Sequence, residues 1–246
     1  FFILYPLFNY NKINYDIKLN CSINSKLEIK DKIYLKEIEL DSAKKYCEVI
    51  YNIVFDILVK EKYISGNKLD IYGLSIINCN ECNGIILTEL IRNGIFDNME
   101  SNDIISFLSI FASYKKDGFK SIHYNTEYLF VLETIEKWQN YDIQNQMNIC
   151  TEEFWETTNG YFDIVYDWIS LDMNDKNNMA LIINHLQNMD EYEGNFVKNM
   201  LKIYNICVCL KNISEMLNKL DLTLKLEDLD KKILKNIVNV NSLYLQ

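Results

Sequence analysis

Residues 84–112 read GIILTELIRNGIFDNMESNDIISFLSIFA, and this stretch determines the kind of fold that the chain adopts. Apolar residues recur at helical spacing on both sides of a central turn, which predicts two helices. Asn93-Gly94 is typical of the left-handed turn that ends a helix. Ser101 is a frequent N-cap residue, and Asp103 in the turn after it favours the positive end of a helix dipole. The stretch therefore predicts a helical hairpin.

The composition of the whole chain favours long helices. The 246 residues are 49% hydrophobic, which suffices for one large domain or two small ones with a sizeable core. One proline and seven glycines are few for a fold with many turns. We expect a mainly α fold, a helical bundle with a small β-containing, winged-helix portion near the N-terminus. Because the first residue is Phe1 rather than Met, we also expect the chain to be part of a longer polypeptide.

The first 73 residues should differ from the rest. Residues 14–40 alternate between apolar and polar side chains and contain β-branched and aromatic residues, which predicts two or three strands. We therefore assign residues 1–42 to a strand-rich segment. Residues 43–73 predict a helix that ends near Tyr63-Ile64, a turn and a short strand, the order in which a winged-helix unit ends.

From residue 74 to residue 246 we expect helices only, with Trp138, Trp155 and Trp168 as core anchors. The patterns predict a helix at 84–93, a second from Ser101, a polar loop at 114–125, helices at 126–148, within 154–171 and at 175–187, the longest helix from 194 to about 220, and a last one at 226–239.

Motifs that carry catalysis are absent from the sequence. It contains no P-loop, DExH box, GxGxxG, HExxH or GxSxG. The two histidines, His123 and His185, lie far apart, which disfavours a Ser-His-Asp or Cys-His arrangement. Cys79-x-x-Cys82 has no second pair to complete a zinc site. We expect no catalytic residue, no metal site and no cofactor in this chain, which is not an enzyme by itself.

The cysteines and the first residues bear on location. Seven scattered cysteines without a visible secretory signal indicate free thiols in a reducing compartment, either nucleus or cytoplasm. The apolar start FFILYPLF is far shorter than the roughly 20 residues that span a membrane. We therefore expect an intracellular protein without a membrane partner.

The net charge of −10 argues against a free-standing RNA binder, since such proteins are usually basic. Residues 194–246 hold eight lysines and five acids, or +3, so the rest carries −13. Any RNA contact should therefore lie in the C-terminal part, or the RNA affinity should come from another domain. The alternative is a non-catalytic helical module whose acidic surface binds a protein partner.

The predicted helix from residue 194 offers the best candidate contact. Lys198, Lys202, Asn205, Cys209 and Asn212 follow each other at steps of four, three, four and three, which places them in one stripe opposite an apolar face. Lysine and asparagine side chains so arranged can touch phosphates and 2′-hydroxyls without reading sequence. The alternative is an ordinary solvated helix face.

Several stretches resemble one known family. LTELIRNGIF with SNDIISFLSIFA is similar to the opening of the DSHCT domain, the C-terminal helical domain of superkiller-type DExH RNA helicases that work with the RNA exosome. VYDWISLDMND, YEGNFVKNMLKIYNICVCLKNI and the closing NIVNVNSLYLQ resemble later segments of that domain. The resemblance covers about residues 43–246. The family has a glycine where this chain has Leu171 or Asp172.

The resemblance implies roles for particular residues. The segment from Tyr192 is similar to the ratchet helix, which lies under the RNA that leaves the helicase core. The family's basic positions fall on Lys198 and Lys202, although the second is usually arginine, and an acid stands where this chain has Asn205. The family's acid in the first helix falls on Glu89, which would face the same RNA. The alternative for Glu89 is a solvated helix charge.

The resemblance implies an accessory domain of an ATP-dependent 3′-to-5′ RNA helicase that guides single-stranded RNA without sequence preference. In the terms of that family, residues 1–42 would be the remainder of an arch or β insertion. By the resemblance, ATP and Mg²⁺ would bind to helicase core domains outside this chain. The expected partners are RNA, those core domains of the same polypeptide, and exosome-type assemblies.

Overall fold

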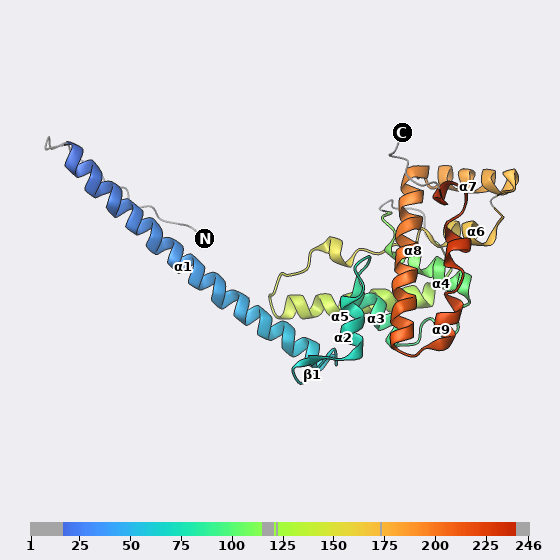
Figure 1. Ribbon diagram of the computed structural model, residues 1–246, viewed down its shortest axis with the longest axis horizontal. Helices are drawn as coiled ribbons and strands as arrows, with labels where there is room; N and C mark the ends of the chain where they lie inside the picture. The colour runs from blue at the N-terminus through green and yellow to red at the C-terminus, as the bar shows by residue number, and fades with distance from the viewer. Residues whose placement is uncertain (1–16, 115–120, 122, 173, 240–246) are drawn as a thin grey trace. The chain divides into compact units, whose positions relative to one another are not determined.

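The computed structural model describes residues 17–114, 121, 123–172 and 174–239 (Figure 1). The apolar start and the closing SLYLQ lie outside these residues, as does most of the expected polar loop at 114–125. The chain divides into two compact units, residues 1–54 and 55–246.

One long helix, α1 (Ile17–Lys60), makes up the described part of the first unit, and its last residues, 55–60, belong to the second. The expected strands at 14–40 are therefore wrong from residue 17 onward, and residues 14–16 lie outside the described part. No Gly or Pro interrupts α1, and Leu, Lys and Glu, which are good helix formers, are frequent in it.

Charged residues in and just after the strand-like stretch 14–40 form ion pairs along α1 instead. The Lys36 ammonium lies 2.5 Å from the Glu39 carboxylate, and the Lys45 ammonium lies 2.8 Å from Asp41. These pairs have the i,i+3 and i,i+4 spacing of neighbours on a helix surface. A strand would need a partner to bond its backbone, whereas a helix satisfies its own backbone locally.

The second unit begins with the end of α1 and a small hairpin. Strands β1 (Ile64–Ser65) and β2 (Lys68–Leu69) pair antiparallel around Gly66, whose φ of +62° suits glycine. The expected turn is confirmed, but the strand is only two residues long, and α2 (Ile71–Ile77) follows at once. A winged-helix assignment for this part stays a prediction.

The hairpin of helices that the opening stretch predicts is confirmed. Helix α3 (Gly84–Arg92) ends at Asn93, and Gly94 has the left-handed φ of +68°. Helix α4 (Ser101–Phe107) continues into the 3₁₀ turn η1 (Leu108–Phe111). The N-cap is Glu100 rather than Ser101, and its N–H donates to the Asp103 carboxylate at 3.1 Å.

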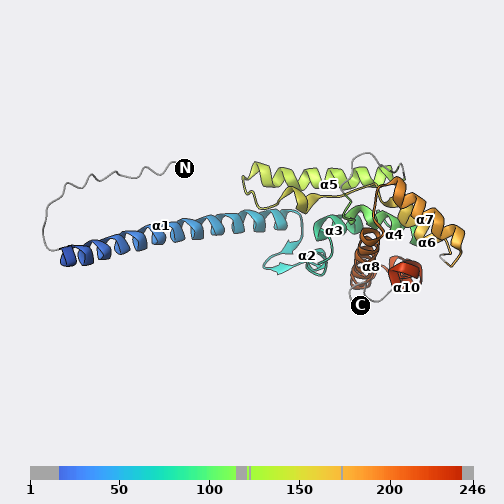
Figure 2. The same cartoon turned by 90° about the horizontal axis from the view of Figure 1, so that it is seen from above.

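The middle of the chain is helical as expected, with shorter elements. Helix α5 lies against α3, as Figure 2 shows. The expected helix within 154–171 is a 3₁₀ turn followed by a shorter helix. The elements are α5 (Asn125–Gln144), η2 (Glu152–Trp155), α6 (Phe162–Ser170) and α7 (Lys176–Asn188).

Helix α8 (Glu193–Met216) is the longest of the second unit, while α1 is longer still, contrary to expectation. The single helix expected at 226–239 is wrong. Its place is taken by α9 (Leu220–Lys225), α10 (Leu229–Ile233) and η3 (Asn236–Asn239). Positive φ angles at Asp228 and Asn236, of 57° and 48°, interrupt the helix there.

The core of the second unit lies where α4 packs on α6 and where α8 packs on η1, α9 and α10. Its largest side chains are aromatic, and the Trp168 indole donates to the Ile233 carbonyl at 3.0 Å. All three tryptophans are buried, which confirms them as core anchors. The fold is therefore mainly α, a helical bundle with one small hairpin. Among the described helices, none combines the length and apolar composition that crossing a membrane requires.

Candidate nucleic-acid interface

Helix α8 presents the predicted stripe at its surface. Lys198, Asn205 and Asn212 are exposed, and Lys202 and Cys209 are half-buried. The opposite face is packed in the core, with Phe196, Met200, Ile203, Ile206, Cys207 and Leu210 buried. Within the part of the chain that the structure describes, neither lysine takes part in a salt bridge. Their ammonium groups are therefore available to an anion.

The boundary between the two faces of α8 differs from the sequence pattern at a few positions. Leu201 is apolar, yet it is 41% exposed. The Tyr204 hydroxyl donates to the Asp230 carboxylate at 2.6 Å, which joins α8 to α10. Asn199 is buried and its side-chain oxygen accepts from the Ser113 N–H at 2.9 Å. The helical spacing of the sequence does not distinguish Asn199 from the stripe residues, so the sequence did not predict that Asn199 is buried and bonded to Ser113.

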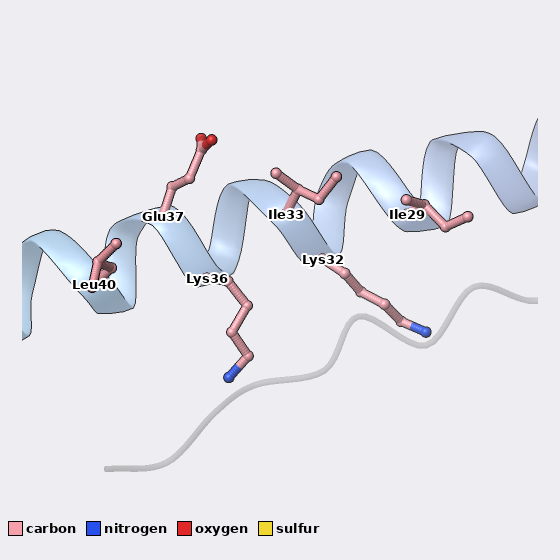
Figure 3. Close-up of a pocket in the computed structure, with 6 residues that line it drawn as sticks. All are labelled: Ile29, Lys32, Ile33, Lys36, Glu37 and Leu40. Carbon is pink, nitrogen blue, oxygen red and sulfur yellow. The ribbon is translucent and has the colours of Figure 1, made fainter.

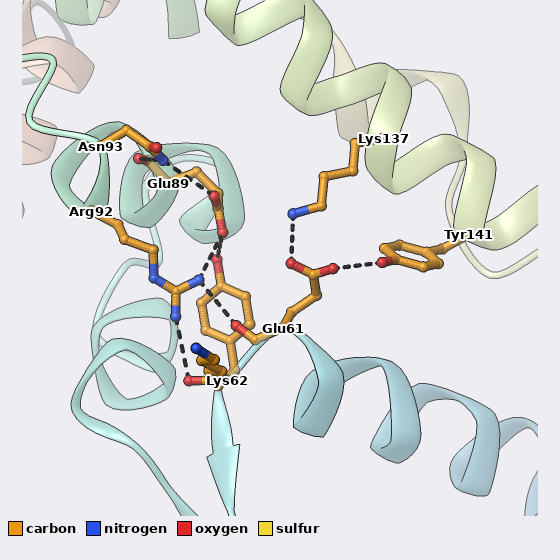
Figure 4. A network of polar contacts seen from close by, with 8 residues as sticks. Glu61, Lys62, Glu89, Arg92, Asn93, Lys137 and Tyr141 are labelled. Atoms are coloured by element: carbon orange, nitrogen blue, oxygen red, sulfur yellow. Dashed lines mark hydrogen bonds and ion pairs between the residues drawn. The ribbon is translucent and has the colours of Figure 1, made fainter.

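Glu89 does not lie on an open face. The residue is 6% exposed, and its carboxylate accepts from the Tyr63 hydroxyl and from the Arg92 guanidinium, the latter at 3.2 Å (Figure 4). The Asn93 amide donates to the Glu89 carbonyl at 2.9 Å. The interpretation of Glu89 as a solvated helix charge is wrong. Its expected contact with RNA stays a prediction, which this burial does not favour.

Arg92 connects this buried carboxylate to the end of α1. Its guanidinium donates to the carbonyls of Glu61 and Lys62 at 3.0 and 3.3 Å, and it lies 4.7 Å from the ring centroids of both Tyr63 and Tyr72. Burial, followed by the bond to Glu89, raises the pKa of Tyr63. The network therefore holds the hairpin region against α3. The i,i+3 spacing of Glu89 and Arg92 is the sequence signal that could have indicated it.

A serine, a histidine and an aspartate meet elsewhere, beside a cavity of about 350 Å³. The Ser121 hydroxyl donates to Asp163 at 2.8 Å, and His123 Nδ1 lies 2.6 Å from the same carboxylate oxygen. A nucleophilic serine needs the histidine as its base, with the carboxylate behind the histidine. Here the same ring nitrogen, His123 Nδ1, faces the carboxylate and lies 3.5 Å from the serine oxygen, while the serine itself bonds to Asp163, so the three groups are not in the order of a Ser-His-Asp triad.

Other hollows lie among the residues that the structure describes. One of about 550 Å³ lies where the turn after α3 meets α9, and Phe96, Asp97, Lys219 and Lys225 are among its lining residues. A shallow hollow of about 360 Å³ on α1 is lined by six residues of that single helix, among them Ile29, Ile33 and Leu40 (Figure 3). It is the surface of one helix. Within the described ranges, no group of three or more His, Cys, Asp or Glu side chains is arranged to hold a metal ion.

The helical bundle belongs to a defined family of domains. The DSHCT (NUC185) domain matches residues 66–241, so the chain belongs to the DSHCT family. All of helix α1 and the first strand precede the matched residues. The chain is also 25% identical, over 167 residues, to mRNA transport homolog 4 of Caenorhabditis elegans. The aligned part covers 65% of this chain and 15% of that protein, so the chain corresponds to a small part of its relative.

Proposed function

We propose that this chain is the C-terminal accessory domain of an ATP-dependent 3′-to-5′ RNA helicase of the DExH class, of the superkiller type that works with exosome-type assemblies. Membership of the DSHCT family supports the proposal. The name of the C. elegans relative refers to mRNA transport, which is consistent with RNA as the substrate. The observation that carries the proposal is the stripe of Lys198, Lys202 and Asn205 along α8, with both ammonium groups outside salt bridges among the described residues.

The stripe would guide single-stranded RNA by its backbone. Two lysines four residues apart are separated by about 6 Å along a helix, so they offer two successive point charges to phosphates. Asn205, about one turn further on, can donate to or accept from a 2′-hydroxyl. None of these groups reads a base, so the contact should be independent of sequence.

Catalysis would take place in other domains. The sequence has no P-loop and no DExH box, so ATP and Mg²⁺ would be held by helicase core domains of a longer polypeptide. The bundle would pack against those domains and keep α8 beside the strand that leaves them. Glu89 has no part in this proposal, because its carboxylate is buried and bonded to Tyr63 and Arg92.

The test is a titration of single-stranded RNA against the 246-residue chain at several salt concentrations. Changing both Lys198→Gln and Lys202→Gln should reduce the slope of log K against log salt by about 1.4, since each lost contact accounts for about 0.7. The control is Lys68→Gln with Lys176→Gln, two exposed lysines outside the stripe whose loss changes the net charge equally. If the two double variants gave equal slopes of log K against log salt, the stripe would not be the part of the chain that contacts RNA.

The second candidate is a non-catalytic module that binds a protein. The observation in its favour is the acidic balance of −13 outside residues 194–246. Such a module would show no RNA affinity even at low salt. Crosslinking in the complete protein distinguishes the two further, because the helicase proposal expects RNA crosslinks within 195–212 and the interaction module expects none.

A further inference from the structure

Three cysteines from distant parts of the sequence meet beside the stripe. Cys79 and Cys82 lie in the loop between α2 and α3, with their sulfur atoms 3.2 Å apart. The Cys209 sulfur on α8 lies 3.2 Å from the Asn78 carbonyl oxygen, next to Cys79. All three thiols are free. The sequence shows the Cys79-x-x-Cys82 pair, but only the fold adds Cys209.

The surroundings favour a thiolate at Cys79. Hydrogen bonds from the thiols of Cys209 and Cys82, helped by the backbone at Cys82 and Glu81, lower the pKa of Cys79 to about 4 against the opposing effect of burial. The same bonds raise the pKa of Cys82 and of Cys209, because each would lose its bond to Cys79 on losing its proton. The Lys202 ammonium favours negative charge here as well. Within the cluster, these contacts favour the thiolate form at Cys79.

We propose that Cys79 and Cys82 are a redox-active pair that hydrogen peroxide converts into a disulfide, with Cys209 as a positioning residue for Cys79. The thiolate sulfur of Cys79 attacks one peroxide oxygen and the O–O bond breaks. Cys79 becomes a sulfenic acid, and the other oxygen takes a proton and leaves as water. The Cys82 sulfur then attacks the Cys79 sulfur, the S–O bond breaks, and a second water leaves with the Cys82 proton. One peroxide is reduced to two waters while two thiols become one disulfide.

Proximity and charge distinguish this pair from Cys150 and Cys207. Cys79 is 7% exposed and Cys82 is half-buried, which suits a small oxidant better than a large disulfide. Burial raises the pKa of Cys207 and of Cys150, so both remain thiols and react slowly. In reducing compartments, disulfides are usually transient and serve catalysis or redox sensing. A pair of this kind would make the loop before α3 responsive to peroxide.

The test is oxidation of the 246-residue chain with one equivalent of hydrogen peroxide, followed by denaturation, alkylation and mass spectrometry. Trypsin releases residues 69–92 as one peptide that contains both cysteines. We expect this peptide to lose two hydrogen atoms and take up no alkyl group, and dithiothreitol to reverse the change. Cys150 and Cys207 should be alkylated. The proposal would be overturned by full alkylation of Cys79 and Cys82. It would also be overturned by a sulfinic acid on Cys79 with Cys82 alkylated, or by a Cys79–Cys209 disulfide.

A comparison of variants tests the positioning role. Cys209→Ala removes the first donor to Cys79 and should slow disulfide formation at about pH 5 several-fold, since the pKa of Cys79 rises and its thiolate fraction at that pH falls. Cys209→Ser keeps a donor and should keep most of the rate, while Cys150→Ser serves as the control. Circular dichroism checks that each variant is folded. A Cys209→Ala variant that is folded and reacts as fast as the unaltered chain would exclude Cys209 from the site.

Discussion

Glu61, just after the end of α1, has neighbours that favour the ionised form of its carboxyl group. Its carboxylate accepts from the Lys137 ammonium and from the Tyr141 hydroxyl, each at 2.5 Å (Figure 4). Burial acts to raise the pKa of Glu61, but the hydrogen bonds of Lys137 and Tyr141 and the charges of Lys137 and Lys60 outweigh it, so the pKa is lowered. The pKa of Glu61 is thus lower in the folded chain than in the unfolded chain. Its contacts with Lys137 and Tyr141 therefore stabilise the fold fully at a pH above the unfolded pKa. This stabilisation is lost as the pH falls through the folded pKa.

We therefore predict that Glu61→Gln lowers the free energy of unfolding by about 1 kcal/mol at pH 7, the magnitude of a partly exposed pair. The difference between variant and unaltered chain should shrink as the pH falls below about 4, because the carboxyl group is then protonated in both states. Urea unfolding at a series of pH values measures it. The control, Glu133→Gln, changes an exposed residue on α5, the helix that carries Lys137. A difference that stays constant down to about pH 2 would contradict the ion-pair assignment.

The placement of candidate residues was predictable from the sequence where a single helix defines it. The spacing of Lys198 and Lys202 placed them on the open side of α8, and the structure leaves them there. Glu89 was not predictable in the same way, because its partner Tyr63 lies 26 residues earlier in the chain. The convergence of Cys209 on Cys79 likewise depends on packing between segments that the sequence places far apart.

At the scale of helices and turns, local sequence signals were reliable where they coincide with burial. Helix α3 combines an N-cap at Asn83, whose side chain accepts from the Ile85 N–H at 3.1 Å, with an apolar buried face and a glycine after its end. All these signals indicate the same structure. Residues 17–40 give no such agreement, because their alternating pattern fits a strand and their composition fits a helix. Without a packed face to decide, helix propensity and local ion pairs prevail.

Gly94 allows a direct test of such a signal. Its φ is +68°, and a Cβ there would lie 2.6 Å from a carboxylate oxygen of Asp97. Gly94→Ala should therefore lower the free energy of unfolding by about 1–2 kcal/mol. At Gly194, in the first turn of α8, a Cβ would meet no atom within 4 Å, so Gly194→Ala should be neutral or stabilise by about 0.5–1 kcal/mol. Thermal unfolding of both variants measures the contrast, and similar shifts would contradict the left-handed cap.

At the scale of the whole molecule, the two units differ in what they bury. Between residues 26 and 54, no side chain that the structure describes is buried, and Leu35, Leu40 and Tyr51 are each more than half exposed. Residues 55–239 contain the buried core, including the aromatic side chains around Trp168. Isolated helices without a packed face are only marginally stable in water, since packing supplies most helical stability. The first unit should therefore open far more often than the second.

This difference predicts the course of limited proteolysis. Trypsin should cut the 246-residue chain first after lysines within 26–45, because cleavage follows the population of locally opened states. A fragment that contains the bundle should then persist, and mass spectrometry of a time course identifies the first cuts. Lys176 and Lys198 serve as internal controls, because they are exposed but lie on helices of the packed unit. If residues 26–45 resist as long as these sites, α1 is covered in solution. A resistance that disappears on dilution would assign that cover to a second copy of the chain.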